Sequence, residues 1–260
     1  MKKMVKVKMF EAPENKSRPS VKAPITDAKA FHDVVNSRRS VRFYSDDEIP
    51  QNVIDSCLDA ALKAPNSSNL QAWEIHHVIS QDKKKELIRL CLGQPAASTA
   101  KELFVFVARP DLWKRNNKWM IEEFDRRGDM PEKAYQYFRK ITPMIYSTGV
   151  FGVLAPFKWL FYNIRGIRKP TPREPMGRAG MAVWGHKSTA LACAHFMLAM
   201  RAHGFDSCPM EGLDSKRVKK LLGLPKQAGI TMAISAGKRA EGGIFGDRFR
   251  FDKKSFIITH

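Results

Sequence analysis

The chain has 260 residues, 43% of them hydrophobic, so it can bury a sizeable core. Its 45 Lys and Arg outnumber its 26 Asp and Glu, and the formal charge of +19 predicts attraction to phosphate-bearing cofactors, anionic lipid or nucleic acid. Four irregularly spaced cysteines without a CxxC pair argue against a zinc site or a disulfide framework, and no zinc-finger, helix-turn-helix or RNA-recognition signature indicates specific nucleic-acid binding.

Residues 1–24 are predicted to form a basic N-terminal arm. MKKMVKVKMF begins like a signal peptide, but Glu11, Pro13 and Glu14 end its short apolar run, so a cleaved signal is not expected. The alternation in MVKVKMF also fits a short strand. Unpaired cysteines suit a reducing compartment, and we expect a cytoplasmic protein that could lie at the membrane periphery.

Residues 25–260 are expected to form a single domain. Helices are predicted over 27–38, where Phe31, Val34 and Val35 share one face, and over the stretch that begins at Pro50 and ends before Pro65. Strands are predicted at 73–80 and 103–108, separated by a helix over 82–92.

The segment 141–164, ITPMIYSTGVFGVLAPFKWLFYNI, contains a single charged residue, Lys158. It is long enough for a membrane span, but Pro143 and Pro156 interrupt it. Three interpretations stay open: a lid over a cofactor pocket, as part of an inserted cap of about 110–175, an interfacial hairpin that contacts a membrane, and ordinary core. The interfacial interpretation is favoured by the basic residues that follow, namely Arg165, Arg168, Lys169 and Arg173.

The C-terminal half begins with a long helix over 181–203. This helix is apolar nearly all round, which predicts burial in a core or a subunit interface, and its His186, His195 and His203 are expected to pack or cap. A short helix at 215–223 and a last strand at 229–237 follow. Strands separated by helices of variable length, without a regular βαβ repeat, indicate an α+β fold.

Four polar clusters could carry chemistry. The first, Arg38, Arg39, Ser40 and Arg42, suits a phosphate because guanidinium groups bind phosphate oxygens in pairs, although such a run is often only a solvated surface. The second is the loop of Asn66, Ser67, Ser68, Asn69 and Gln71, which suits either a heteroaromatic edge or plain turn chemistry. The third is an expected loop at 207–214 that presents backbone N–H groups and contains Pro209, Met210, Glu211 and Gly212. The fourth comprises Arg248 and Arg250, after the last strand.

RRSVRFY, APNSSNLQAW, CPMEGLD and the late arginines together resemble the nitroreductase family, over about residues 31–79 and 180–250. The resemblance implies a central, mostly antiparallel sheet flanked by helices, and an interlocked homodimer with two FMN sites at its interface. It implies an enzyme that moves reducing equivalents from NAD(P)H through flavin N5 to an electron-poor small molecule, such as a nitroaromatic or a quinone, by a ping-pong mechanism.

The resemblance also implies a role for each cluster. Contacts to the FMN phosphate, ribityl chain or pyrimidine edge would come from Arg38, Ser40 and Arg42, with Arg39 in the same cradle and with Arg248 or Arg250 on the phosphate. The loop that reaches FMN from the partner subunit would be Asn66, Ser67 and Ser68, with Asn69 and Gln71 at matching polar positions. The stretch against the isoalloxazine would be Pro209, Met210, Glu211 and Gly212, with the Glu211 N–H donating to flavin N5, and Gln94 matches a further polar contact. No catalytic side chain and no metal are expected.

Two alternatives stay open. One is a reductive dehalogenase of the same family, resembling iodotyrosine deiodinase, in which segment 110–175 would grip an aromatic substrate. The other is a basic membrane-surface or nucleic-acid-binding module without redox activity.

Overall fold

The computed structural model describes residues 22–149 and 154–260, with the exception of the side chain of residue 154. Most of the predicted N-terminal arm, including the proposed strand in MVKVKMF, lies outside these residues. Within the two described ranges, no helix combines the length and the hydrophobicity that crossing a bilayer requires.

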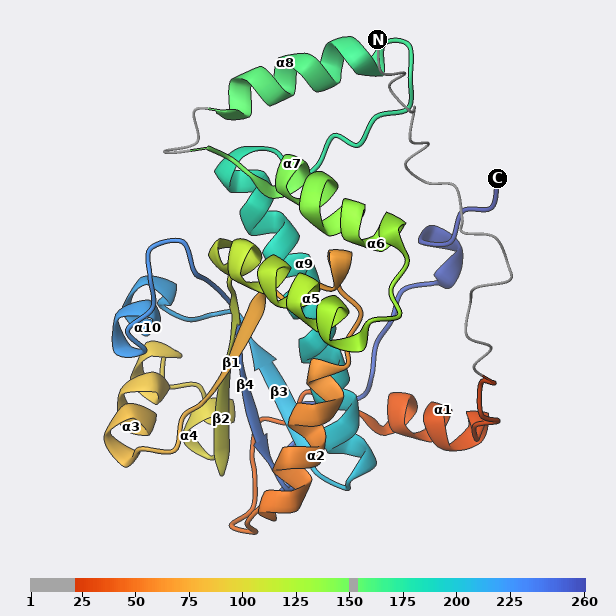
Figure 1. The fold of residues 1–260 in the computed structure, drawn as a ribbon. Helices are drawn as coiled ribbons and strands as arrows, with labels where there is room; N and C mark the ends of the chain where they lie inside the picture. The colour runs from red at the N-terminus through yellow and green to blue at the C-terminus, as the bar shows by residue number, and fades with distance from the viewer. Residues whose placement is uncertain (1–21, 150–153) are drawn as a thin grey trace, which may run out of the picture.

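A four-stranded sheet forms the centre of the molecule, with the strand order β1-β2-β4-β3 (Figure 1). Its strands are β1 (Trp73–His77), β2 (Glu102–Ala108), β3 (Asp206–Met210) and β4 (Gly229–Gly237). All three pairings are antiparallel, which confirms the predicted sheet type. Central strand β2 is buried at every position except the first, as its continuous apolar run predicts.

Strand β3 corrects one prediction. The segment 207–214 was expected to be a loop, but as far as Met210 it pairs with β4, and Pro209 lies opposite Ile234. A proline has no N–H to donate to a ladder, so it is tolerated in a strand at the edge of a sheet, which is where β3 lies. Only the part of the cluster after Met210 is a loop.

The helices match the predicted ones to within a few residues. Helix α9 begins four residues earlier than predicted, at Gly177, and neither the short helix at residues 95–98 nor the helices between residues 113 and 166 were predicted. The α-helices are α1 (Ala28–Ser37), α2 (Gln51–Leu62), α3 (Gln81–Leu90), α4 (Pro95–Ser98), α5 (Trp113–Arg127), α6 (Glu132–Gln136), α7 (Thr142–Tyr146), α8 (Leu154–Gly166), α9 (Gly177–Ala202) and α10 (Ser215–Leu221), with a π-helical turn at Tyr137–Ile141.

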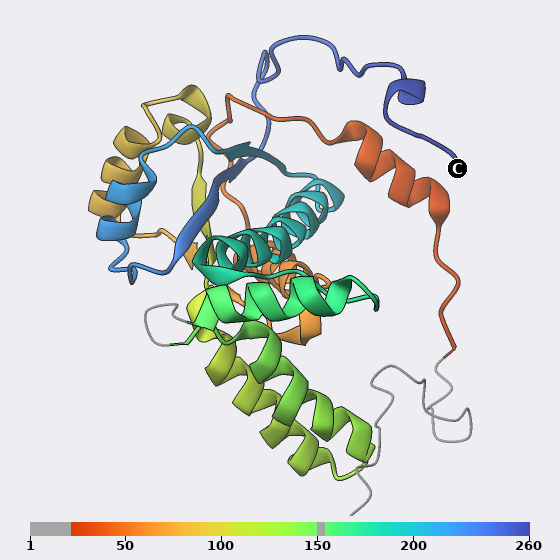
Figure 2. The ribbon, with the colours of Figure 1, turned by 90° about the horizontal axis from the view of Figure 1, so that it is seen from above.

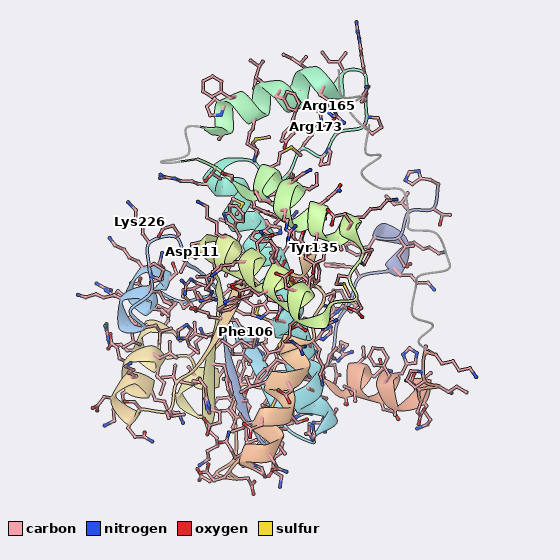
Figure 3. The ribbon with its side chains drawn as sticks, viewed as in Figure 1. Phe106, Asp111, Tyr135, Arg165, Arg173 and Lys226 are labelled. Carbon is pink, nitrogen blue, oxygen red and sulfur yellow. The ribbon has the colours of Figure 1, made fainter. Side chains whose placement is uncertain are left out.

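Each face of the sheet carries its own helical layer. On one face, Phe104 and Phe106 of β2 pack against Phe196 of α9, and α2 completes this core (Figures 1 and 3). On the other face, Val105 and Val107 pack among residues of α3, α4 and α10. The alternation of these four side chains follows from the two-residue period of a strand.

A third apolar cluster lies beyond the sheet, where α5, the π-helical turn and α7 meet the first half of α9. Phe138 and Tyr146 are buried there against Trp113 and Trp184. Part of the segment 141–164 therefore packs in a core, whereas α8 lies at the end of the molecule, beyond α7 (Figure 1).

Helix α1 and the C-terminal segment reach away from the body on the same side (Figure 2). Helix α1 starts at Asp27, whose side chain accepts from the N–H of Lys29 at 2.8 Å and of Ala30 at 3.1 Å. It contains no buried residue, and Phe31 is 58% exposed. Of the predicted apolar face, Val34 and Val35 are thus partly covered by the same protomer, whereas Phe31 is left exposed.

Candidate functional site

The arginine-rich segment that follows α1 lies beside strand β3. Ser40 forms a parallel bridge with Ser207, and the Val41 N–H donates to the Ser207 carbonyl at 3.3 Å. The Arg42 N–H donates to the Gly243 carbonyl at 2.8 Å. Because Val41 is also fully buried, the backbone of this segment is held on both sides.

These arginines and the C-terminal segment enclose a cavity of about 240 Å³. Its lining consists of Arg38, Arg39, Ser40, Arg42 and residues 244–250. Arg39 donates to the Gly246 carbonyl, and Arg248 donates to the Arg38 carbonyl. The first and fourth sequence clusters, which are separated by about 200 residues, thus form one structure that we call the arginine cradle.

The cradle carries an excess of positive charge, since five arginines and one carboxylate, that of Asp247, line it. Burial lowers the pKa of Arg38, and the nearby charges of Arg248, Arg250 and Arg39 lower it further. The guanidinium groups repel one another, and a bound anion would relieve this repulsion because it attracts all of them at once. A phosphate group fits this requirement.

A buried carboxylate stabilises the surroundings of the cradle. Asp206, the first residue of β3, accepts from Arg239 at 2.7 Å and from Arg201 of α9 at 3.0 Å. Arg239 also donates to the Ser37 carbonyl at the end of α1, at 3.4 Å. Sequence analysis did not identify Asp206 and Arg239, because residues 33 positions apart carry no local signal of pairing.

The third cluster continues directly from the same strand. After Met210, the chain turns through Glu211 and Gly212, and Gln94 donates from Nε2 to the Gly212 carbonyl at 3.0 Å. Strand β3 therefore connects Ser207, which lies beside the cradle, to this turn. Gln94 thus lies at the turn formed by Glu211 and Gly212.

The second cluster, which lies elsewhere in the protomer, is the loop of Asn66, Ser67, Ser68, Asn69 and Gln71, and we call it the polar loop. The polar loop borders a cavity of about 560 Å³, which is lined by Asn66, Ser67 and Ser68 and by residues of α7 and α9. The next residues of the loop, Asn69 and Gln71, line a larger cavity of about 770 Å³ between α2, β1 and α5. Neither lining includes a residue of the arginine cradle.

Two tyrosines hold the polar loop. The hydroxyl of Tyr146 is 2.9 Å from that of Ser67 and 3.0 Å from that of Ser68, and the Tyr137 hydroxyl is 2.7 Å from Ser68. Ser68, at φ +57°, is in the left-handed region, which is uncommon for a residue with a side chain. Tyr137 and Tyr146 were missed as site residues, because sequence patterns did not show that their segment meets this loop.

The remaining reactive side chains have packing roles. All four cysteines are buried, and burial raises the pKa of Cys57 to about 12 and that of Cys91 to about 11. His186 is hydrogen-bonded through Nδ1 to the Thr231 hydroxyl at 2.9 Å, as its predicted packing role requires. Among the described residues, no group of three or more His, Cys, Asp or Glu side chains is arranged to hold a metal ion.

Comparison with known proteins assigns a family to this arrangement. A family model described as "Nitroreductase family" matches residues 35–238. A protein of Thermus thermophilus named NADH dehydrogenase is 25% identical over 237 residues, covering 88% of this chain and 95% of that protein. Human iodotyrosine deiodinase 1 is 28% identical over 241 residues, covering 92% of this chain and 71% of that protein.

Solved structures share the fold. The Bacillus subtilis protein ydfN superposes with a TM-score of 0.73 at 20% identity, covering 90% of this chain and all of that one. A protein of Exiguobacterium sibiricum, solved in complex with FMN, superposes with a TM-score of 0.65 at 21% identity, covering 92% of this chain and all of that one. The α+β architecture is therefore shared along almost the whole chain.

Proposed function

Because this chain belongs to the nitroreductase family, we propose that it is an FMN-dependent oxidoreductase that transfers electrons from NAD(P)H to an electron-poor small molecule. The family supports the oxidoreductase class. The observation that supports FMN is the arginine cradle, in which five arginines line one small cavity against a single carboxylate, that of Asp247.

The residues of the cradle fit the phosphate end of FMN. Arg38, Arg42 and Arg248 would donate to phosphate oxygens, and the Ser40 hydroxyl would add a neutral donor. Arg39 belongs to the same cradle, and Arg250 contributes charge to it. This donor set is flexible only at its side chains, because the segment is fixed to β3 and to Gly243.

The turn after β3 is proposed to serve the ring end of the cofactor. When bound, FMN supplies the chemistry, since it accepts hydride at N5 and gives it up again. Pro209 and Met210 would lie against the ring, held by the pairing of β3 with β4. The Glu211 N–H would donate to N5, and Gln94 would stabilise the turn through Gly212. No side chain is required as an acid or base.

The arrangement supports a homodimer. The polar loop and the cradle belong to the same family motif set, yet they line different cavities in one protomer. Helix α1 carries Phe31 on an uncovered face, and the C-terminal segment exposes Phe249 at 69% and Phe251 at 70%. We propose that these parts interlock with a second copy, whose Asn66, Ser67 and Ser68 complete the site, with Asn69 and Gln71 at its border.

The segment of about 110–175 is proposed to cap the acceptor side of this site. The contacts of Tyr137 and Tyr146 with the polar loop support this role, since they connect the segment to a cofactor-binding element. The similarity to iodotyrosine deiodinase 1 over 241 residues makes reductive dehalogenation the second candidate. In that case the same segment would hold a halogenated phenol.

The deciding experiment starts from the absorbance spectrum of the purified full-length protein, with and without added FMN. Flavin bands that bleach under anaerobic NADH or NADPH, and return with a nitroaromatic or a quinone, would support the proposal. Return with a halotyrosine alone would favour the dehalogenase. A protein that neither contains nor takes up FMN would refute both and leave the basic binding module.

A further inference from the structure

Helix α8 is attached to the body along one side only. Lys158 donates from Nζ to the carbonyls of Ile145 at 2.7 Å and Ser147 at 3.0 Å, which joins the helix to the end of α7. Tyr162, one helical turn after Lys158 in α8, is half-buried. At the far end, Asn163 accepts from Arg173 at 2.6 Å.

The opposite side of α8 presents an apolar stripe to solvent. It consists of Phe157, Leu160, Phe161 and Ile164, which are spaced as i, i+3, i+4 and i+7 and are 51 to 72% exposed. Such spacing places all four side chains on one face of a helix. Soluble surfaces seldom expose four large apolar side chains in one row, so the stripe indicates a contact surface.

The surroundings of the stripe are mainly positive, although the exposed Glu174 follows Arg173 in the chain. Residues 133–173 contain eight Lys and Arg and no Asp or Glu. Arg165, Arg168 and Lys169 are exposed at the C-terminal end of α8, and Figure 3 shows Arg165 and Arg173 at this end of the molecule. The partner of the stripe must therefore combine an apolar interior with an anionic surface.

We propose that α8 binds the surface of a membrane that contains anionic lipid. The apolar stripe would enter the boundary between headgroups and acyl chains, and Arg165, Arg168 and Lys169 would lie among the lipid phosphates. A second copy of the chain fits less well, since its α8 could cover the apolar stripe but would offer no anionic groups to Arg165, Arg168 and Lys169. Nucleic acid would neutralise the charge but leave the apolar stripe in water.

Helix α8 belongs to the proposed cap, but its apolar stripe lines neither the arginine cradle nor the cavity beside the polar loop. Figure 1 shows α8 at the top of the molecule and α1 low on its right side, so the two helices do not form one continuous surface. The inference does not depend on FMN, and it would stand if the proposed redox activity failed.

The test uses the full-length protein and flotation with vesicles of phosphatidylcholine, with or without about 30% phosphatidylglycerol. Binding is expected only with the anionic lipid and should weaken with salt. The triple variant R165Q/R168Q/K169Q should lose roughly 100-fold in affinity, because each basic residue near an anionic surface contributes about fivefold. The matched control K83Q/K85Q/K216Q removes the same charge from exposed positions on α3 and α10, and should bind as wild type does.

The apolar contribution is tested with L160S/F161S. This variant should lose about tenfold or more in affinity for the anionic vesicles. The control I25S/I79S, which changes exposed apolar residues elsewhere, should keep the wild-type affinity. Circular dichroism of each variant checks folding. Equal losses in the two charge variants would overturn the proposal in favour of nonspecific attraction. Binding unaffected by L160S/F161S would also overturn it, as would a vesicle-free dimer that this variant dissociates.

Discussion

Arg239 donates from Nη2 to Asp206 Oδ1 over 2.7 Å and from Nε to Oδ2 over 3.1 Å, which makes a two-bonded ion pair on a carboxylate that is only 2% exposed. Through the further bond of Arg239 to the Ser37 carbonyl, this pair connects the start of β3 with the end of α1. The arginine cradle begins at the next residue. The stability of the fold and the shape of the cradle are therefore coupled at Asp206.

Asp206→Asn should destabilise the protein by about 3 kcal/mol, because it leaves Arg201 and Arg239 without their shared anion in a largely buried place. Urea denaturation measures this change, and FMN affinity should fall as well. Asp55→Asn, which alters an exposed carboxylate on α2, is the matched control and should change little. Equal stability of the two variants would show that the ion pair does not contribute to the free energy of unfolding.

Arg38→Gln should weaken FMN binding by roughly 10- to 100-fold, since a charge-assisted hydrogen bond to phosphate contributes about 1.5–3 kcal/mol. Riboflavin, which lacks the phosphate, should bind the variant and the wild type alike. Flavin fluorescence titration gives both affinities, with the exposed Arg126→Gln as control. A parallel loss for riboflavin would mean that the substitution damages the fold rather than the phosphate contact.

Tyr146→Phe removes a hydroxyl that contacts both Ser67 and Ser68. We expect a loss of about 1 kcal/mol in the free energy of unfolding and a several-fold weaker FMN affinity, because the strained loop would lose part of its support. Tyr162→Phe on α8 is the conservative control. If affinity and stability both stayed at the wild-type values, the tyrosine contacts would have no role in positioning the loop.

The pH dependence of the free energy of unfolding should include a contribution from His186. Burial lowers its pKa below the ordinary 6.5, although the charge of Glu211 opposes this in part. The unfolded chain then takes up a proton at a higher pH than the folded protein does, so stability falls as pH drops below about 6.5 towards the lowered pKa. His186→Gln should make this fall shallower in urea denaturation between pH 7 and pH 5, relative to the control His32→Gln. An unchanged slope would contradict the assignment.

The four thiols should react slowly in the folded protein. Burial keeps them protonated and shields them from reagents, as the raised pKa of Cys57 and Cys91 indicates. Titration with a thiol-specific chromogenic disulfide at pH 8 should release colour from all four only after denaturation. Lys83→Cys, at an exposed position of α3, should add one fast-reacting thiol. Fast reaction of the wild-type protein would reveal an opening of the core.

The sequence by itself determined the type of fold and most of its elements. The apolar run of β2 and the 3.6-residue period of α2 and α9 are local patterns, so each could be predicted from its own residues. The family motifs also predicted the cradle residues and Gln94 as cofactor contacts, which stays a prediction; in the fold, Arg248 bonds to Arg38 and Gln94 to Gly212. Strand β3 was missed because Pro209 argues against a strand, and only its place at the edge of the sheet allows one.

The tertiary structure decided how these elements meet. Ser40 lies beside Ser207, Arg248 reaches the Arg38 carbonyl, and Tyr146 holds Ser67, and each contact joins segments that are far apart in the chain. It also showed that one side of α8 is bonded to α7 while the other exposes its apolar stripe. A sequence pattern records which side of a helix is apolar, but the packing of the whole chain determines whether that side is covered.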